Sequence, residues 1–172
     1  MKIKLFISLV HEKKILTWEN LLKKGFIGPS SFYLCGMHEE MIKHLLNLCP
    51  FTSIAWDWVA TIFRQTDMDR LSVSNNLKNW RNNFSGNEIV NKAYILVPGF
   101  VIWNVWKERN NHIFSNKTSK PQNIMEQILR YIKDIVRGLL RALPKDPPLP
   151  HEVRILLHLS LQTIGPLGIM KT

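Results

Sequence analysis

The chain has few cysteines and few acidic residues, and it has no long uninterrupted apolar stretch. Its 172 residues include two cysteines, so no disulfide framework is predicted and a reducing compartment is expected. The longest apolar run, residues 93–106, is shorter than the roughly 20 residues of a membrane-spanning helix. The apolar stretch near the N-terminus ends at Val10 without a small-residue cleavage site. We therefore expect an intracellular protein, nuclear or cytoplasmic, that is neither secreted nor membrane-bound.

Motifs of the common enzyme classes are also missing. The sequence contains no glycine-rich phosphate loop, no His-Glu-x-x-His helix and no adjacent aspartates of the kind that hold two magnesium ions. No serine or cysteine lies in a recognisable nucleophile context. We expect no catalytic residues and no enzymatic activity.

Basic residues, by contrast, are abundant. Lysine and arginine number 23 against 13 aspartates and glutamates, which gives a net charge of +10, and the excess is spread along both halves of the chain. Hydrophobic residues make up 45%, enough for a folded core. This balance favours a polyanionic partner, RNA or single-stranded DNA, with a basic but inert surface as the alternative.

The apolar spacing predicts an all-α protein. Ile3, Phe6, Ile7 and Val10 share one face of a helix over residues 3–15. Thr17 is a predicted N-cap and Gly25 a predicted stop for the next helix.

Further helices are predicted along the rest of the chain. One covers residues 39–48 with Met41, Leu45 and Leu48 facing inward, and Pro50 ends it. Thr52 or Ser53 then caps another helix, whose apolar residues are Ile54, Ala55, Trp58, Ile62 and Phe63. Longer helices are predicted over 88–114, where Pro98-Gly99 offers a break, and over 121–143.

Residues 31–51 carry a candidate metal-binding pattern. Cys35, His44 and Cys49 follow Cys-x8-His-x4-Cys, and Phe32 stands three residues before Cys35, where a Cys-x2-Cys pair would begin. A structural zinc site takes four nitrogen or sulfur ligands in a tetrahedron. The pattern is that of a four-ligand site with its first position replaced.

This stretch resembles the zinc-binding domain that follows the reverse transcriptase in plant LINE-type (non-LTR) retrotransposons. Residues 14–35, KILTWENLLKKGFIGPSSFYLC, are similar to the family's approach to the first ligands, and residues 38–51, HEEMIKHLLNLCPF, to its His-to-Cys helix. Residues 102–114, IWNVWKERNNHIF, resemble the Trp-x-x-Trp-Lys-Glu-Arg-Asn stretch that follows this domain. The resemblance covers about residues 1–64 and 88–143.

The resemblance implies a zinc ion held by four residues, of which Cys35, His44 and Cys49 match and Phe32 does not. His38 is the one nearby substitute ligand. The alternative is that the Phe32 ring fills the vacated space while both thiols pack as small apolar groups. We favour this alternative and expect a degenerate site in a chain that folds without zinc.

The chain accordingly divides into four predicted regions. They are a reverse-transcriptase zinc-binding-like region (1–64), an Asn/Ser-rich surface connection with one helical turn around Trp80 (65–87), a helical region (88–143), and a Pro-rich linker with an unassigned tail (144–172). The expected fold is a small, irregular helical domain with a degenerate zinc-binding loop and a Pro-linked C-terminal tail.

Candidate nucleic-acid-binding residues lie in the helical region. Arg130, Lys133, Arg137 and Arg141 share one stripe of the helix over 121–143, opposite an apolar arc. The stripe could track a phosphate backbone or be the solvated face of a core helix; a membrane-surface helix is disfavoured because its flanks lack aromatic residues.

The stretch around residues 102–114 offers further candidates. Lys107 and Arg109 are candidate phosphate contacts, although solvation alone would also explain them. Trp103 and Trp106 lie one turn apart, where base stacking and core packing are both open and core packing is favoured.

Together these observations predict a non-catalytic fragment of a retrotransposon polyprotein that binds RNA or single-stranded DNA weakly and without sequence preference. Its other expected partners are the reverse transcriptase or further retroelement proteins. The competing interpretation is a helical protein-interaction module that docks on a polymerase or another partner and does not itself bind nucleic acid.

Overall fold

The structure, a computed structural model, describes residues 2–28, 34–36, 39–66, 68–82 and 88–141, together with Arg154 and His158. All regular elements in these residues are helices, which confirms the all-α prediction. They are α1 (Lys2–His11), α2 (Trp18–Leu22), the single π-helical turn η1 (His44–Leu48), α3 (Pro50–Phe63), α4 (Val73–Asn82), α5 (Glu88–Ser115) and α6 (Pro121–Arg141). None of them is long and apolar enough to cross a membrane. Apart from Arg154 and His158, the predicted linker and tail over 144–172 lie outside the described residues.

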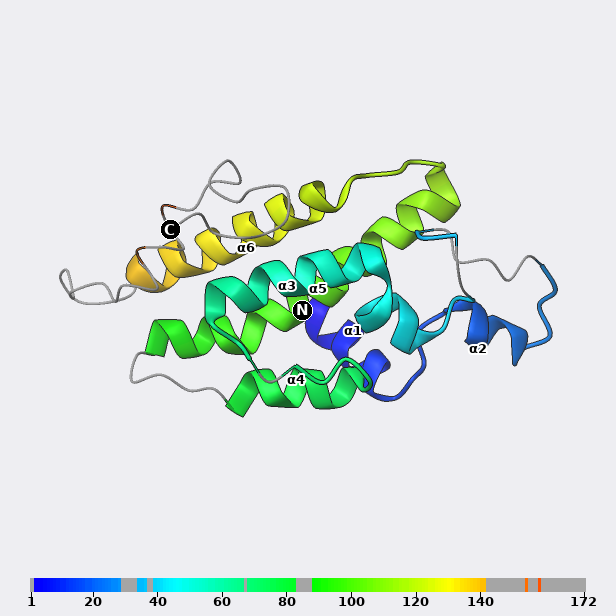
Figure 1. Cartoon of the computed structure of the whole chain (residues 1–172), viewed down its shortest axis with the longest axis horizontal. Helices are drawn as coiled ribbons and strands as arrows, with labels where there is room; N and C mark the ends of the chain where they lie inside the picture. Colours follow the sequence, from blue (N-terminus) through cyan, green and yellow to red (C-terminus); the bar gives the residue numbers. More distant parts are fainter. Residues whose placement is uncertain are drawn as a thin grey trace.

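The long helix α5 is the centre of the molecule. It has 28 residues, and α1, α3, α4 and α6 all pack against it, as Figure 1 shows. The predicted break at Pro98-Gly99 does not occur, because α5 continues through Pro98. Gly99 instead lets α1 approach: a Cβ atom at this position would lie 2.8 Å from Cδ1 of Ile7. Gly99 therefore serves helix packing, and Pro98 is accommodated within the helix.

A ten-residue helix replaces part of the predicted surface connection. Residues 73–82 form α4, and Trp80 is fully buried against Trp56 and Phe63 of α3, with ring centroids 6.1 and 5.7 Å away. The backbone N–H of Asn75 donates to Oγ of Ser72 (3.2 Å), a cap that starts the helix. The prediction of a single turn here is wrong, because tertiary burial outweighs the low helix propensity of asparagine and serine. Residues 83–87 lie outside the described part.

The segment over 39–48 is helical only from Ile42. Its buried face also differs from the predicted one. Leu45 and Leu46 are fully buried, whereas Met41 is 45% and Leu48 37% exposed. The predicted inward set is wrong for Met41, which lies before the first helical residue, and for Leu48, because the π turn holds an extra residue and rotates the apolar face.

Helix α3 begins earlier than predicted. Pro50 is its first residue and Cys49 its N-cap, in place of Thr52 or Ser53. The Thr52 hydroxyl instead donates to the carbonyl oxygen of Leu45 (2.7 Å). Ile54, predicted as apolar packing, is 44% exposed. The predicted stop before Pro50 is confirmed.

The N-terminal helices begin as predicted, but α1 ends at His11 and not at residue 15, because Lys13 takes a left-handed φ of +55°. Phe6 and Val10 are the buried residues of α1. Thr17 is the N-cap of α2, although its hydroxyl is buried and makes no hydrogen bond, and Gly25 follows the helix with φ +83°. Figure 1 shows α2 projecting at one end of the molecule.

Candidate metal centre and nucleic-acid interface

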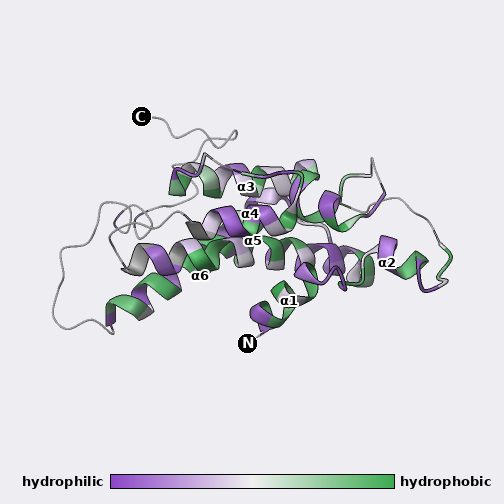
Figure 2. Ribbon diagram, turned by 90° about the horizontal axis from the view of Figure 1, so that it is seen from below, coloured by the Kyte–Doolittle hydropathy of each residue, from purple (hydrophilic) through white to green (hydrophobic). Residues whose placement is uncertain are grey.

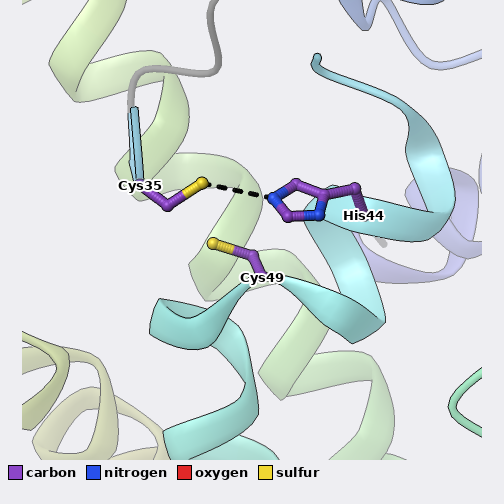
Figure 3. Close-up of side chains that lie close together, drawn as sticks. All are labelled: Cys35, His44 and Cys49. Atoms are coloured by element: carbon purple, nitrogen blue, oxygen red, sulfur yellow. Dashed lines mark hydrogen bonds between the residues drawn. The ribbon is translucent and has the colours of Figure 1, made fainter. Parts of the chain in front are cut away.

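The structure brings Cys35, His44 and Cys49 together. Their ligand atoms all lie within 4.8 Å of one another, and Sγ of Cys35 is 3.3 Å from Nε2 of His44 (Figure 3). Cys35 comes from the segment 34–36, and the other two residues border the π turn η1. Cys49 is fully buried, His44 is buried and Cys35 is half-buried.

The π turn explains how a His-x4-Cys spacing produces a shared site. On an α-helix, two side chains that are five residues apart point in directions about 140° apart around the helix axis. In η1 the N–H of Cys49 instead donates to the carbonyl oxygen of His44 (2.8 Å), which closes a turn of five residues. The imidazole and the thiol are thereby brought to the same side of the chain.

The surroundings of Cys49 oppose ionisation of its thiol when no metal is bound. Burial raises the pKa of its thiol to about 11, and Cys35 adds to the increase. The backbone N–H groups of Phe51 and Thr52, in the first turn of α3, act in the opposite direction and lower it. The thiol is therefore neutral at neutral pH, and a metal ion that binds there must displace its proton.

The donor set suits zinc. Two sulfurs and an imidazole nitrogen are typical zinc ligands, and bond lengths of about 2.3 and 2.0 Å place tetrahedral neighbours roughly 3.6–3.8 Å apart. Sγ of Cys35 and Nε2 of His44 are 3.3 Å apart and no pair of ligand atoms exceeds 4.8 Å, so the three residues are near enough to supply three of four ligands after small shifts. Phe32, at the replaced position, and His38, the predicted substitute, lie outside the described residues. The degeneracy of the site stays a prediction.

Residues 1–56 match the family described as zinc-binding in reverse transcriptase. The match supports a reverse transcriptase zinc-binding domain. It covers all three clustered ligands and ends within α3, so α4, α5 and α6 lie beyond it. Comparison with curated proteins and with solved structures gave no match. Residues 1–56 are called the zinc-binding region below, after the family that they match.

A buried ion pair joins the zinc-binding region to α5. Nε and Nη2 of Arg109 donate to the two carboxylate oxygens of Glu40 at 2.9 and 2.6 Å, and the two side chains are 6% and 2% exposed. The same carboxylate accepts the backbone N–H of Trp18 at the start of α2 (2.9 Å). Arg109 therefore holds the zinc-binding region in place and is not available to a phosphate, so the prediction that it binds nucleic acid is wrong.

The neighbours of Arg109 also make structural contacts. Lys107 donates to the side chain of Gln127 in α6 (3.0 Å), and burial lowers the pKa of its amine. Glu108 is buried and accepts the N–H of Ser119 (2.7 Å), ahead of α6. The Lys-Glu-Arg-Asn stretch thus connects α5 to both α6 and the zinc-binding region. The sequence analysis did not predict this structural role. The signal available for it was that charges of both signs, Lys107, Glu108 and Arg109, interrupt an otherwise apolar stretch.

The predicted basic stripe lies on the outer face of α6. Arg130, Arg137 and Arg141 are exposed and Lys133 is half-buried, while the opposite arc contacts the core. The buried residues of that arc are Ile124, Met125, Ile128, Leu129, Ile132 and Val136. In Figure 2 the helix is accordingly a mixture of hydrophilic and hydrophobic segments.

Two nearby carboxylates partly balance the stripe. Arg130 donates to Glu126 (3.3 Å) and Arg137 lies 3.8 Å from Asp134. Such exposed pairs contribute little free energy, so either arginine can exchange its partner for a phosphate.

The two tryptophans of α5 are half-buried. Trp103 and Trp106 both pack on Phe6 of α1, with ring centroids 5.3 and 5.6 Å apart. Arg109 lies over the Trp106 ring at 4.9 Å. Trp106 is therefore part of the contact between α1, α5 and the ion pair, whereas Trp103 also lines a cavity.

Proposed function

We propose that the chain is a non-catalytic accessory module of a LINE-type retroelement that binds RNA or single-stranded DNA weakly and without sequence preference. The exposed basic face of α6 carries this proposal. Its apolar arc is pinned to α5 and α3, so Arg130, Arg137 and Arg141 project from a fixed support. The net charge of +10 and the family match of the zinc-binding region are consistent with such a role.

A salt titration tests the proposal. Each phosphate contact on a single strand contributes a log–log slope of about −0.7, so three contacts predict roughly −2. Arg137→Gln with Arg141→Gln should reduce the slope by about one unit or more and weaken binding to all sequences alike, because phosphate contacts carry no base information.

The matched control is Lys23→Gln with Lys24→Gln, which removes the same charge from exposed residues beside α2. The control should leave the slope nearly unchanged. A slope that is equal in both double variants and in the unmodified chain would contradict a role for the α6 face.

The three clustered ligands give the zinc-binding region a structural role in this proposal. A zinc ion held by Cys35, His44 and Cys49 would cross-link the segment 34–36 to the start of α3 and supply no catalytic chemistry. We propose that folding does not require it, because the Glu40–Arg109 pair and the apolar core already hold this region. Unfolding of the purified chain by a strong chelator would contradict this part of the proposal.

A second candidate function is docking on a reverse transcriptase. Leu22, Phe26 and Ile27, in and after α2, are 50%, 56% and 99% exposed, and α2 projects from the molecule (Figure 1). Isolated apolar residues are common on surfaces, but such a projecting group suits a protein partner. Changing the three residues to serine should abolish binding to a purified LINE-type reverse transcriptase in calorimetry, with RNA binding unchanged. Equal affinity of the serine variant would reject this candidate.

A further inference from the structure

A cavity of about 440 Å³ lies between α1, α5 and α6. Phe100 and Trp103 of α5 and Tyr131 of α6 contribute three aromatic rings to its wall, and Lys2 and Lys4 of α1 stand at it with exposed side chains. No carboxylate occurs among the described residues that line it. The cavity therefore combines an aromatic wall with positive charge.

The aromatic wall is held rigidly. The rings of Phe100 and Tyr131 are stacked, with centroids 4.9 Å apart and planes 4° from parallel. Trp103 is fixed by its edge-on contact with Phe6 at 5.3 Å. Tyr131 is nevertheless 36% exposed, so the wall is open to a ligand.

The cavity also borders the basic face of α6. Tyr131 directly follows Arg130, and the amine of Lys107 lies 5.6 Å from the centre of the Tyr131 ring. A strand held by Arg130 would therefore lie beside Tyr131, at one wall of the cavity.

We infer that this cavity takes one unpaired base of a single-stranded nucleic acid, with Trp103 and Tyr131 contacting the base and Lys2 and Lys4 binding the adjacent phosphates. Every base has an apolar π-face, so an aromatic wall recognises bases without sequence preference, and lysines bind phosphates as point charges. A cavity of this size is typical of small-molecule and nucleotide sites. The inference rests on the proposed function and adds the place where a base is held.

Photocrosslinking locates the base directly. A mixed-sequence single-stranded RNA of 12 nucleotides that contains 5-iodouridine is bound to the full chain, irradiated and digested, and the crosslinked peptides are identified by mass spectrometry. We expect crosslinks on the peptides that contain Trp103 or Tyr131. Crosslinks confined to other peptides would overturn the inference.

Affinities of paired variants give an independent measurement. Tyr131→Leu should weaken RNA binding about fivefold or more, whereas the control Phe114→Leu, at an exposed aromatic residue away from the cavity, should not. Lys2 and Lys4 would add two contacts to the three of α6, which makes the expected salt slope of the unmodified chain roughly −3.5. Lys2→Gln with Lys4→Gln should reduce it by about 1.4, against little change for Lys23→Gln with Lys24→Gln.

The outcomes separate the inference from the proposed function. Salt-dependent binding that Tyr131→Leu leaves unchanged, with crosslinks elsewhere, would overturn the cavity site and leave the α6 interface intact. Absence of salt-dependent binding by the unmodified chain would overturn both. If Tyr131→Leu fails to fold, the crosslinks of the unmodified chain decide.

Discussion

Glu40 is the residue on which the position of the zinc-binding region depends most. Its buried carboxylate receives two hydrogen bonds from Arg109 and one from the backbone of Trp18. Removing the arginine leaves a buried charge without its partner. We therefore expect Arg109→Met to lower the free energy of unfolding by about 3–5 kcal/mol.

Denaturant unfolding of a matched set checks this prediction. Arg130→Met, at the exposed pair with Glu126, should cost only about 0–1 kcal/mol. Adding Glu40→Gln to Arg109→Met should recover part of the loss, because the remaining side chain is then neutral. A loss below about 1 kcal/mol for Arg109→Met would show that the pair is not a structural tie.

Phe32 is the residue on which the predicted degeneracy of the zinc site depends. Three ligands are already within 4.8 Å of one another, so Phe32→Cys should supply the fourth at the family spacing. Loss of an outer-shell partner alone changes metal affinity 10–100-fold, and a full ligand should change it by more than about 100-fold. Competition with a chromophoric chelator measures the affinity.

The controls for Phe32→Cys are Phe32→Ser and the double variant with His44→Ala. Neither should gain the high affinity, because each has at most three ligands. Tight zinc binding by the unmodified chain would instead show that another residue, with His38 as the first candidate, completes the site.

The sequence predicted the cluster of three ligands, but it did not predict the Glu40–Arg109 ion pair. Cys35, His44 and Cys49 lie within 15 residues, and a local turn brings them together. Arg109 and Glu40 lie 69 residues apart in the sequence, and no local pattern indicates that these two charges form a buried pair. Arg109 was therefore interpreted as a surface residue on the strength of its charge alone.

At the scale of the elements, the two glycines within helices α5 and α6 have opposite roles. A Cβ at Gly138 in α6 would meet no described atom within 4 Å apart from its chain neighbours and the backbone of its own helix, whereas a Cβ at Gly99 would lie 2.8 Å from Ile7 and 3.3 Å from Ile3. Alanine favours a helix over glycine by about 1 kcal/mol. We expect Gly138→Ala to raise the free energy of unfolding by about 0.5–1 kcal/mol and Gly99→Ala to give no gain or a loss.

Thermal and denaturant unfolding of the two alanine variants distinguishes these cases. Adding Ile7→Val to Gly99→Ala should recover stability by removing the methyl group nearest to the new Cβ. Equal stabilisation by both alanine substitutions would mean that α1 does not pack closely on α5.

The elements were predictable where they are long and periodic. The helices predicted over 88–114 and 121–143 match α5 and α6 because apolar residues repeat at helical spacing for several turns. Helix α4 was missed because its stability comes from Trp80 packing on α3, a contact that its own composition does not reveal. The inward face over 39–48 was misassigned because a π turn changes the period within one helix turn.

At the scale of the whole molecule, we expect that the zinc-binding region does not fold on its own. The family match ends at residue 56, but Glu40 needs Arg109 of α5, and Phe6 packs on Trp103 and Trp106. A fragment of residues 1–56 would expose these apolar faces and an unpaired carboxylate. We expect it to be unfolded, whereas residues 1–141 retain a cooperative transition.

Far-UV circular dichroism and denaturant titration of the two fragments check this expectation. Excess zinc should not fold residues 1–56, because the missing contacts are to α5 and not to the metal. A cooperative transition of the short fragment, with or without zinc, would contradict it.

The distance along the chain between Glu40 and Arg109 also bears on the order of events during synthesis. Arg109 is the 69th residue that the ribosome adds after Glu40. Throughout that interval α1 and η1 lack the helix α5 against which they pack, although domains generally fold as units during translation. We therefore expect the N-terminal third of the chain to reach its native packing only after α5 has left the ribosome.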